Sequence, residues 1–150
     1  KALSKDFAKA QDKDKIKCVY IDPPYNTGLN FRNYSDKLPH SHWLSIMKPR
    51  LILLRELMSE PGIILIQLDD NEYAHLDILM SEIFSESNRI GTIIWRRRQS
   101  QANLSRAMST IHDYILVYAK NKEQCSIKSF DPLWVDTDKY GHDQIATRKG

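Results

Sequence analysis

The sequence predicts an α/β fold built on an open sheet, in which parallel strands come first and an antiparallel hairpin follows. Residues 16–21 and 63–68 are short, nearly continuous apolar runs separated by a helical stretch, which is typical of strands buried on both faces of a parallel sheet. Residues 90–98 and 113–120 also have strand character. The segment 99–112 between them is rich in Ser, Gln, Asn and Thr and has no helical pattern, which favours a hairpin.

The first strand leads into a predicted loop over 29–39 and then into helical structure over about 41–60. Cys18 lies within this strand and is expected to be an inert core residue. Pro49 is expected to divide the helical stretch into two helices, because proline removes a helical hydrogen bond. Pro61-Gly62 is expected to stop the second helix before the next strand begins.

A further helix is expected over about 71–85, directly after the second strand. Asp69 and Glu72 have the spacing of a capping box at its start, so helix initiation is favoured over catalysis for both residues. Beyond residue 121 the sequence is polar and is expected to be irregular.

The composition limits the class of protein. The chain has 150 residues, a length that suits one domain, and its formal charge of +3 suits a polyanionic partner without requiring one. Its two cysteines lie far apart, and no Cys/His cluster indicates a metal site or a disulfide framework. No apolar run approaches the length of a membrane span and no signal-peptide pattern opens the chain, so we expect a cytoplasmic protein without membrane contact.

The segment most informative about function is Asp22-Pro23-Pro24-Tyr25, which directly follows the first strand. Ligands of open parallel sheets bind outside the carboxyl ends of the strands. Proline offers a rigidly held carbonyl and no N–H donor, and Tyr25 offers a ring on which a base can stack. The structural alternative is a strand that ends in a Pro-Pro turn with a capping aspartate. A ligand-binding role for the segment is favoured over this alternative.

These residue types suit transfer of a methyl group to an amino group on adenine or cytosine. That nitrogen is a poor nucleophile because its lone pair is delocalised into the ring. The Asp22 carboxylate and a carbonyl of the diproline can each accept one of its N–H groups, which localises the lone pair for attack on an electrophilic methyl. A base within a duplex cannot reach such a pocket, so it must be flipped out of the helix.

Other candidate residues carry weaker signals. Arg96, Arg97 and Arg98 are candidates for contacts with DNA phosphates, and a solvated strand end is an equally weighted alternative. Asn26 is favoured as a turn residue ahead of Gly28. His40 and His112 are favoured as surface or capping histidines, because neither belongs to a catalytic-triad pattern. The remaining glycines form no G-x-G motif.

Five segments in this order resemble the amino-methylating DNA methyltransferases, and the resemblance covers about residues 16–120. It is closest to the modification subunits of type III restriction–modification systems, which methylate adenine using S-adenosylmethionine. The segments are 21–28, reading Ile-Asp-Pro-Pro-Tyr-Asn-Thr-Gly, and 40–51, 66–72, 88–95 and 112–120.

The resemblance implies a partial Rossmann-like, S-adenosylmethionine-dependent methyltransferase sheet and a site-specific DNA adenine N6-methyltransferase acting on a flipped adenine in double-stranded DNA. It implies that Asp22, Pro23, Pro24 and Tyr25 form the catalytic base pocket and that Asp22 also borders the cofactor. A restriction subunit is an implied partner. Methylation of the cytosine N4 amino group remains an alternative, as does a non-catalytic remnant that binds DNA or a partner subunit.

The chain departs from the family pattern in one respect, because the family also needs a glycine-rich loop for the cofactor. We therefore expect that loop beyond residue 150. Residues 1–128 are then the catalytic half of the methyltransferase domain, and residues 129–150 are a linker or the start of a target-recognition region. Such a half should be inactive alone and should expose a sheet edge, which favours poor solubility or a homodimer.

Overall fold

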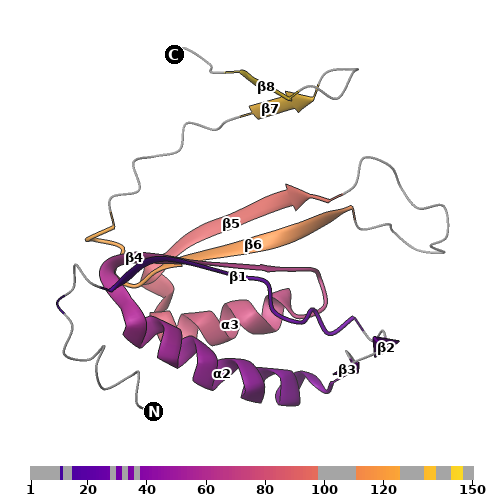
Figure 1. The fold of residues 1–150 in the computed structure, drawn as a ribbon, viewed down its shortest axis with the longest axis horizontal. Helices are drawn as coiled ribbons and strands as arrows, with labels where there is room; N and C mark the ends of the chain where they lie inside the picture. Colours follow the sequence, from indigo (N-terminus) through magenta and orange to yellow (C-terminus); the bar gives the residue numbers. More distant parts are fainter. Residues whose placement is uncertain are drawn as a thin grey trace.

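The computed structural model describes residue 11 and residues 15–27, 30–31, 34–35, 38–97, 111–125, 134–137 and 143–146. Its centre is a four-stranded sheet with two helices against one face (Figure 1). The strand order is β1 (Ile16–Ile21), β4 (Met58–Leu68), β6 (His112–Ala119) and β5 (Arg89–Arg96). The helices are α2 (His40–Leu57) and α3 (Tyr73–Phe84), and a short 3-10 helix, η2 (Glu86–Asn88), follows α3.

The strand directions confirm the predicted α/β class. Strands β1 and β4 are parallel, whereas β6 is antiparallel to both β4 and β5. The predicted strand at 16–21 has those bounds, and the predicted hairpin is formed by β5 and β6. Most of the hairpin connection expected at 99–112 lies outside the described residues.

The core lies between the helices and one face of the sheet. Alternate residues of β4, Ile64, Ile66 and Leu68, are completely buried there, as the two-residue period of a strand requires. Helix α2 adds an apolar stripe, and Phe84 of α3 packs with Tyr118 of β6. The other buried apolar side chains of this cluster are Val19, Trp43, Met47, Leu51, Met58, Leu76, Leu79, Met80 and Leu116.

The expectation that the first strand is buried on both faces was wrong. Cys18 is exposed and is not a core residue, and Tyr20 keeps 53% of its surface exposed. The cause is position, because β1 is an edge strand and both described helices cover the same face of the sheet. A continuous apolar run therefore did not mean burial on both faces.

The expected break at Pro49 does not occur, because α2 is a single helix with Pro49 inside it. Trp43 and Met47 before the proline and Leu51 after it are buried at four-residue spacing. Their burial offsets the roughly 3 kcal/mol that an interior proline costs a helix, so the helix stays continuous. The proline itself faces solvent.

Strand β4 also begins earlier than expected, so Pro61-Gly62 lies within it instead of ending a helix. The register between β1 and β4 shifts here, from Ile16 opposite Met58 to Cys18 opposite Ile63. A methyl group on Gly62 would lie 2.9 Å from the carbonyl oxygen of Ser59 and 3.0 Å from that of Ile16. Only glycine fits this irregular pairing without a backbone shift.

Two short strand pairs occur where loops were expected. Within 29–39, β2 (Asn30–Phe31) pairs with β3 (Tyr34–Ser35), and beyond residue 121, β7 (Trp134–Thr137) pairs with β8 (Asp143–Ala146). Both pairs are antiparallel. Among the described residues, no helix is long and apolar enough to span a membrane.

The close contacts at Gly62 lead to a stability prediction. We expect Gly62→Ala to lower the free energy of unfolding by about 1–3 kcal/mol, because the new methyl must displace backbone atoms. Gly91→Ala is the matched control, since a methyl there meets no atom within 4 Å, and it should change stability by less than about 1 kcal/mol. Urea unfolding of both variants measures this, and equal effects of the two substitutions would contradict the packing argument.

Candidate active site

Polar and aromatic side chains lie close together at the end of the sheet where β1 and β4 have their carboxyl ends, beside the Asp-Pro-Pro-Tyr motif. Because β1 and β4 are parallel, their carboxyl ends meet at this edge, and the antiparallel β6 begins where β5 ends there. The segments that come together are 22–27 after β1, 69–72 after β4, 95–97 at the end of β5 and 112–114 at the start of β6.

The Asp-Pro-Pro-Tyr segment continues directly from β1 and is held by a helix. Asp22 and Pro24 are exposed, and Tyr25 is partly buried against the core. Trp43 is 2% exposed and donates a hydrogen bond from Nε1 to the carbonyl oxygen of Pro24 at 2.8 Å. The Trp43 indole therefore packs in the core and also fixes the diproline to α2.

Tyr25 and Asp22 interact directly. Burial is the largest cause that raises the pKa of Tyr25 well above its ordinary value, and a hydrogen bond to the Asp22 carboxylate is the next. The negative charges of Asp113 and Asp22 act in the same direction, whereas a hydrogen bond with Gln67 opposes them. The phenol therefore stays protonated at neutral pH and can donate to the Asp22 carboxylate.

Asn26 closes the base of the loop that follows the motif. Its φ of 58° lies in the left-handed region, where asparagine is tolerated better than most residues, and this backbone conformation suits the turn role favoured for it. Its side chain bonds the backbone of Leu38 in both directions, with Nδ2 donating to the carbonyl at 2.8 Å and Oδ1 accepting from N–H at 2.7 Å. Nδ2 also donates to Glu72.

Glu72 is completely buried and does not form the predicted capping box. Helix α3 begins without a side-chain cap from Glu72, and Asp69 accepts a bond from the N–H of Asn71 at 3.0 Å. The Oε1 atom of Glu72 instead contacts Asn26 and lies 2.9 Å from Nδ1 of His40. His40 is thus the partner of a buried carboxylate, although 57% of its side chain is exposed.

A chain of polar contacts crosses the face of the sheet opposite α2 and α3. The hydroxyl of Tyr20 donates to Gln67, and Nε2 of Gln67 donates to Oδ2 of Asp113 at 3.0 Å. Arg97 then pairs with Asp113 through NH1 and Oδ1 at 3.1 Å. Asp113 is 2% exposed, so its pairing with Arg97 partly offsets the cost of burying that charge.

The three arginines therefore have different environments. Arg97 pairs with the buried Asp113 and is partly exposed, and Arg96 is exposed at the end of β5 and also engages another residue. Arg98 lies outside the described residues. Close by, the Tyr114 ring stacks on Tyr73 with centroids 4.4 Å apart and meets the His112 ring edge-on at 4.8 Å. His112 is thus part of an aromatic cluster.

A pocket of about 510 Å³ adjoins the motif. Residues 20–24 form one wall, and the side of α2 that faces the free edge of β1 forms the other, with Ile46, Met47, Arg50 and Leu54. Asp22 lines this pocket and is also exposed to solvent. Its carboxylate can therefore border a molecule bound in the pocket and can also be reached from outside it.

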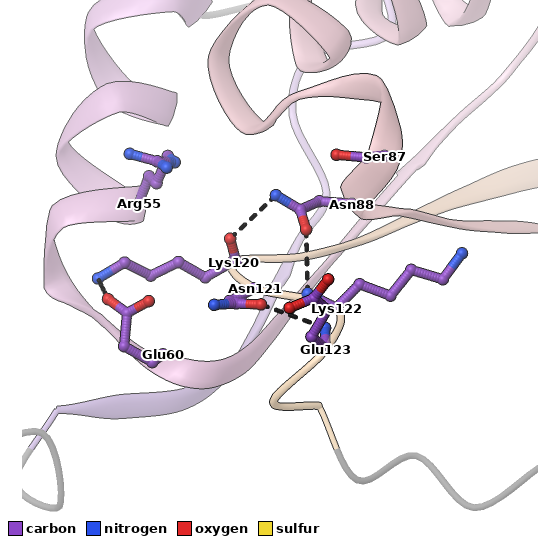
Figure 2. Close-up of a pocket in the computed structure, with 8 residues that line it drawn as sticks. All are labelled: Arg55, Glu60, Ser87, Asn88, Lys120, Asn121, Lys122 and Glu123. Atoms are coloured by element: carbon purple, nitrogen blue, oxygen red, sulfur yellow. Dashed lines mark hydrogen bonds and ion pairs between the residues drawn. The ribbon is translucent and has the colours of Figure 1, made fainter.

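A second pocket, of about 620 Å³, lies at the opposite end of the sheet (Figure 2). Several of its polar and charged groups are engaged by the fold itself. Lys120 bonds the carbonyl of Met58 at 2.8 Å and pairs with Glu60 at 3.0 Å, and Asn88 bonds the backbone of Lys120 and Lys122. These contacts join β4, η2 and the end of β6, which favours a structural role for this region.

Residues 16–149 match the DNA methylase family model N6_N4_Mtase. The Mod subunit of the type III restriction-modification enzyme StyLTI from Salmonella typhimurium is 38% identical over 135 residues, which cover 71% of this chain and 21% of that protein. The EcoP15I Mod subunit from Escherichia coli is 36% identical over 141 residues, which cover 74% of this chain and 22% of that protein. The chain thus spans about a fifth of the length of these relatives.

Solved structures share the fold. A structure of TTHA0409 from Thermus thermophilus, assigned as a DNA modification methylase and complexed with S-adenosyl-L-methionine, has a TM-score of 0.54 at 15% identity, covering 79% of this chain and 50% of that one. The cytosine-N4-specific PvuII DNA methyltransferase has a TM-score of 0.54 at 10% identity, covering 73% of this chain and 44% of that one. These similarities confirm the predicted partial methyltransferase sheet.

The Tyr25–Asp22 contact leads to a pH prediction. The pKa of Tyr25 is raised above the ordinary 10.0, so its contribution to stability is complete below pH 10 and is lost as the pH rises through the folded-state pKa. We expect Asp22→Asn to lower the pKa of Tyr25, because it removes the carboxylate that accepts the phenol proton. Ultraviolet titration of tyrosinate, with Tyr25→Phe subtracted to isolate this residue, measures the shift. An unchanged or higher pKa in Asp22→Asn would contradict the contact.

Proposed function

The chain belongs to the DNA methylase family, and from this we propose that the protein carrying it is a site-specific DNA adenine N6-methyltransferase. We propose that it uses S-adenosylmethionine and serves as the modification subunit of a restriction–modification system. The observation that carries the proposal is the exposed Asp22 carboxylate and rigid diproline at the carboxyl end of an edge strand, beside a pocket. The relatives named as type III Mod subunits support the choice of system.

The geometry limits which groups accept the amino hydrogens of a flipped base. The carbonyl of Pro24 is turned toward Trp43 and accepts its indole N–H, so we assign the two acceptors to the Asp22 carboxylate and the carbonyl of Pro23, which precedes it in the chain. Trp43 and the fixed proline dihedrals hold these oxygens in place before the base arrives, which reduces the cost of ordering them. Two acceptors on one nitrogen localise its lone pair.

The remaining roles follow from the same arrangement. S-adenosylmethionine, when bound, supplies the electrophilic methyl group. The pocket between β1 and α2 is our candidate for the cofactor site, and Asp22 would border the cofactor there. Methylation of the amino group releases one proton, and we assign the Asp22 carboxylate as its acceptor because it is the charged group of the motif. Tyr25 steadies this carboxylate and offers its ring to the base.

The alternative activity within the family is methylation of the cytosine N4 amino group. The same two acceptors serve either base, and the PvuII enzyme shows that the fold also occurs in a cytosine-N4-specific enzyme. The non-catalytic alternative is a remnant that binds DNA or a partner subunit. The identity of about 36–38% to type III Mod subunits favours adenine.

The chain covers only about a fifth of those relatives, so the complete activity is a property of the larger protein. We propose that the glycine-rich cofactor loop is contributed by residues other than 1–150, and that the partners are double-stranded DNA with a flipped base and a restriction subunit. Residues 1–150 alone should then give no methylation. Turnover by these residues alone would contradict this division of the domain.

Single substitutions in the Asp-Pro-Pro-Tyr motif test the proposed activity directly. We expect Asp22→Ala and Tyr25→Ala to lower DNA methylation by at least about a hundredfold in the full protein, because the amino group loses an acceptor or its stacking surface. Nucleoside mass spectrometry of DNA from expressing cells measures this. Glu86→Ala, an exposed carboxylate in η2, is the matched control and should retain the activity.

The modified nucleoside separates the candidates. N6-methyladenine that disappears in the motif variants supports the proposal. N4-methylcytosine would preserve the mechanism and change the substrate, and the absence of any methylated base from a folded full protein would favour the non-catalytic remnant.

The arginines at the end of β5 give a second prediction. Arg96→Glu and Arg98→Glu should weaken DNA binding at every sequence and lower the salt dependence of log Kd by about one unit per lost phosphate contact. Arg97→Glu should also destabilise the fold, because it opposes the buried Asp113 with a second negative charge. Fluorescence anisotropy at several salt concentrations measures the binding.

Lys122→Glu is the charge-matched control, since Lys122 lies at the opposite end of the sheet (Figure 2). Equal loss of affinity in this control would show a general charge effect instead of a specific DNA contact. Unchanged affinity of the two test variants at low salt would remove these arginines from the DNA interface.

A further inference from the structure

Three side chains of metal-ligating types meet beside the loop that follows the motif, although the sequence predicted no metal site. His40 begins α2, Glu72 immediately precedes α3, and His75 lies in the first turn of α3. Each offers one ligand atom, and these three atoms lie within 4.8 Å of one another. The two imidazole rings have centroids 4.4 Å apart. Sequence spacing did not reveal this cluster because His40 and Glu72 lie 32 residues apart in the chain. Only the packing of α2 beside α3 brings their side chains together.

The state of Glu72 provides a second and independent observation. The side chain is completely buried, and its Oε1 atom is shared by Asn26 and His40. Its other oxygen, Oε2, is buried and has no hydrogen-bond partner among the described residues. A buried carboxylate oxygen without a partner is costly, so the cluster has an unmet need for a cation or a donor.

The ligand chemistry indicates which cation fits. Two imidazole nitrogens and one carboxylate oxygen are a donor set that zinc-class divalent ions accept, whereas Ca²⁺ and Mg²⁺ prefer oxygen ligands. Ligand atoms about 2.1 Å from a tetrahedral zinc lie roughly 3.4 Å from one another. His40 Nδ1 and Glu72 Oε1 are 2.9 Å apart, and the widest separation of 4.8 Å requires only a modest side-chain movement.

We propose that His40, Glu72 and His75 form a binding site for Zn²⁺ or a similar divalent transition-metal ion, with a water molecule as the fourth ligand. The ion would join the first turn of α2 to the first turn of α3. Through Glu72 it would also strengthen the attachment of Asn26, the residue directly after the Asp-Pro-Pro-Tyr motif. The site would therefore stabilise the base of the loop beside the active site and would take no part in methyl transfer.

Zinc titration of the full protein tests the proposal, with the protein expressed without a polyhistidine tag and stripped of metal by chelation. Competition with a chromogenic chelator measures the affinity and the stoichiometry for Zn²⁺. Cobalt(II) substitution reports the geometry by its visible absorption. We expect one ion per cluster, a tetrahedral cobalt spectrum without a thiolate band, and a higher Tm with Zn²⁺.

His75→Ala is the sharpest variant, because it removes a ligand and leaves the contacts of Glu72 with Asn26 and His40 in place. We expect it to weaken Zn²⁺ binding by at least about tenfold and to abolish the rise in Tm. His40→Ala should have a similar effect on zinc. His42→Ala is the matched control, since His42 is exposed on the same helix and lies outside the cluster.

Two results would overturn the proposal. One is that the metal-free protein, folded as judged by circular dichroism, binds no Zn²⁺ at micromolar concentrations, which would leave His40 and Glu72 as a simple ion pair. The other is that His75→Ala binds Zn²⁺ as tightly as the parent, or that His42→Ala loses the same affinity.

Discussion

The parallel pairing of β1 with β4 is the constraint on which the arrangement of the site depends. Its register places Ile21 opposite Ile66, so the Asp-Pro-Pro-Tyr segment leaves the sheet beside the end of β4. The antiparallel strands β6 and β5 then bring Asp113 and Arg97 to the same edge. Four segments that are far apart in the sequence thereby share one small region.

Two buried carboxylates hold this edge together from opposite faces of the sheet. Glu72 joins the loop after the motif to the first turn of α2, and Asp113 joins Gln67 of β4 to Arg97 of β5. A buried charge is stabilising only when its partners remain in place. Both residues therefore tie the geometry of this end of the sheet to the side chains packed around them.

The sheet is covered by the described helices on one face only, and β1 presents a free edge beside the motif. Tyr20, Ile93 and Trp95 keep 53%, 47% and 55% of their surfaces exposed. The match covers 50% of the T. thermophilus structure, so about half of that chain has no counterpart here. Tyr20 lies on the edge strand β1, whereas Ile93 and Trp95 lie on β5 at the other edge of the sheet. Exposed apolar side chains on edge strands favour association with further protein.

The sequence by itself determined the strand at 16–21, the hairpin of β5 and β6, and the position of Asp-Pro-Pro-Tyr at a strand end, because these depend on local periodicity and short motifs. It did not determine the single helix through Pro49 or the exposure of Cys18, because both depend on which face of each element is covered. The roles of Trp43, Glu72 and Asp113 were decided only by the tertiary structure. Their partners lie between about 16 and 46 residues away along the chain, so only packing of distant segments brings their hydrogen-bonding groups within reach.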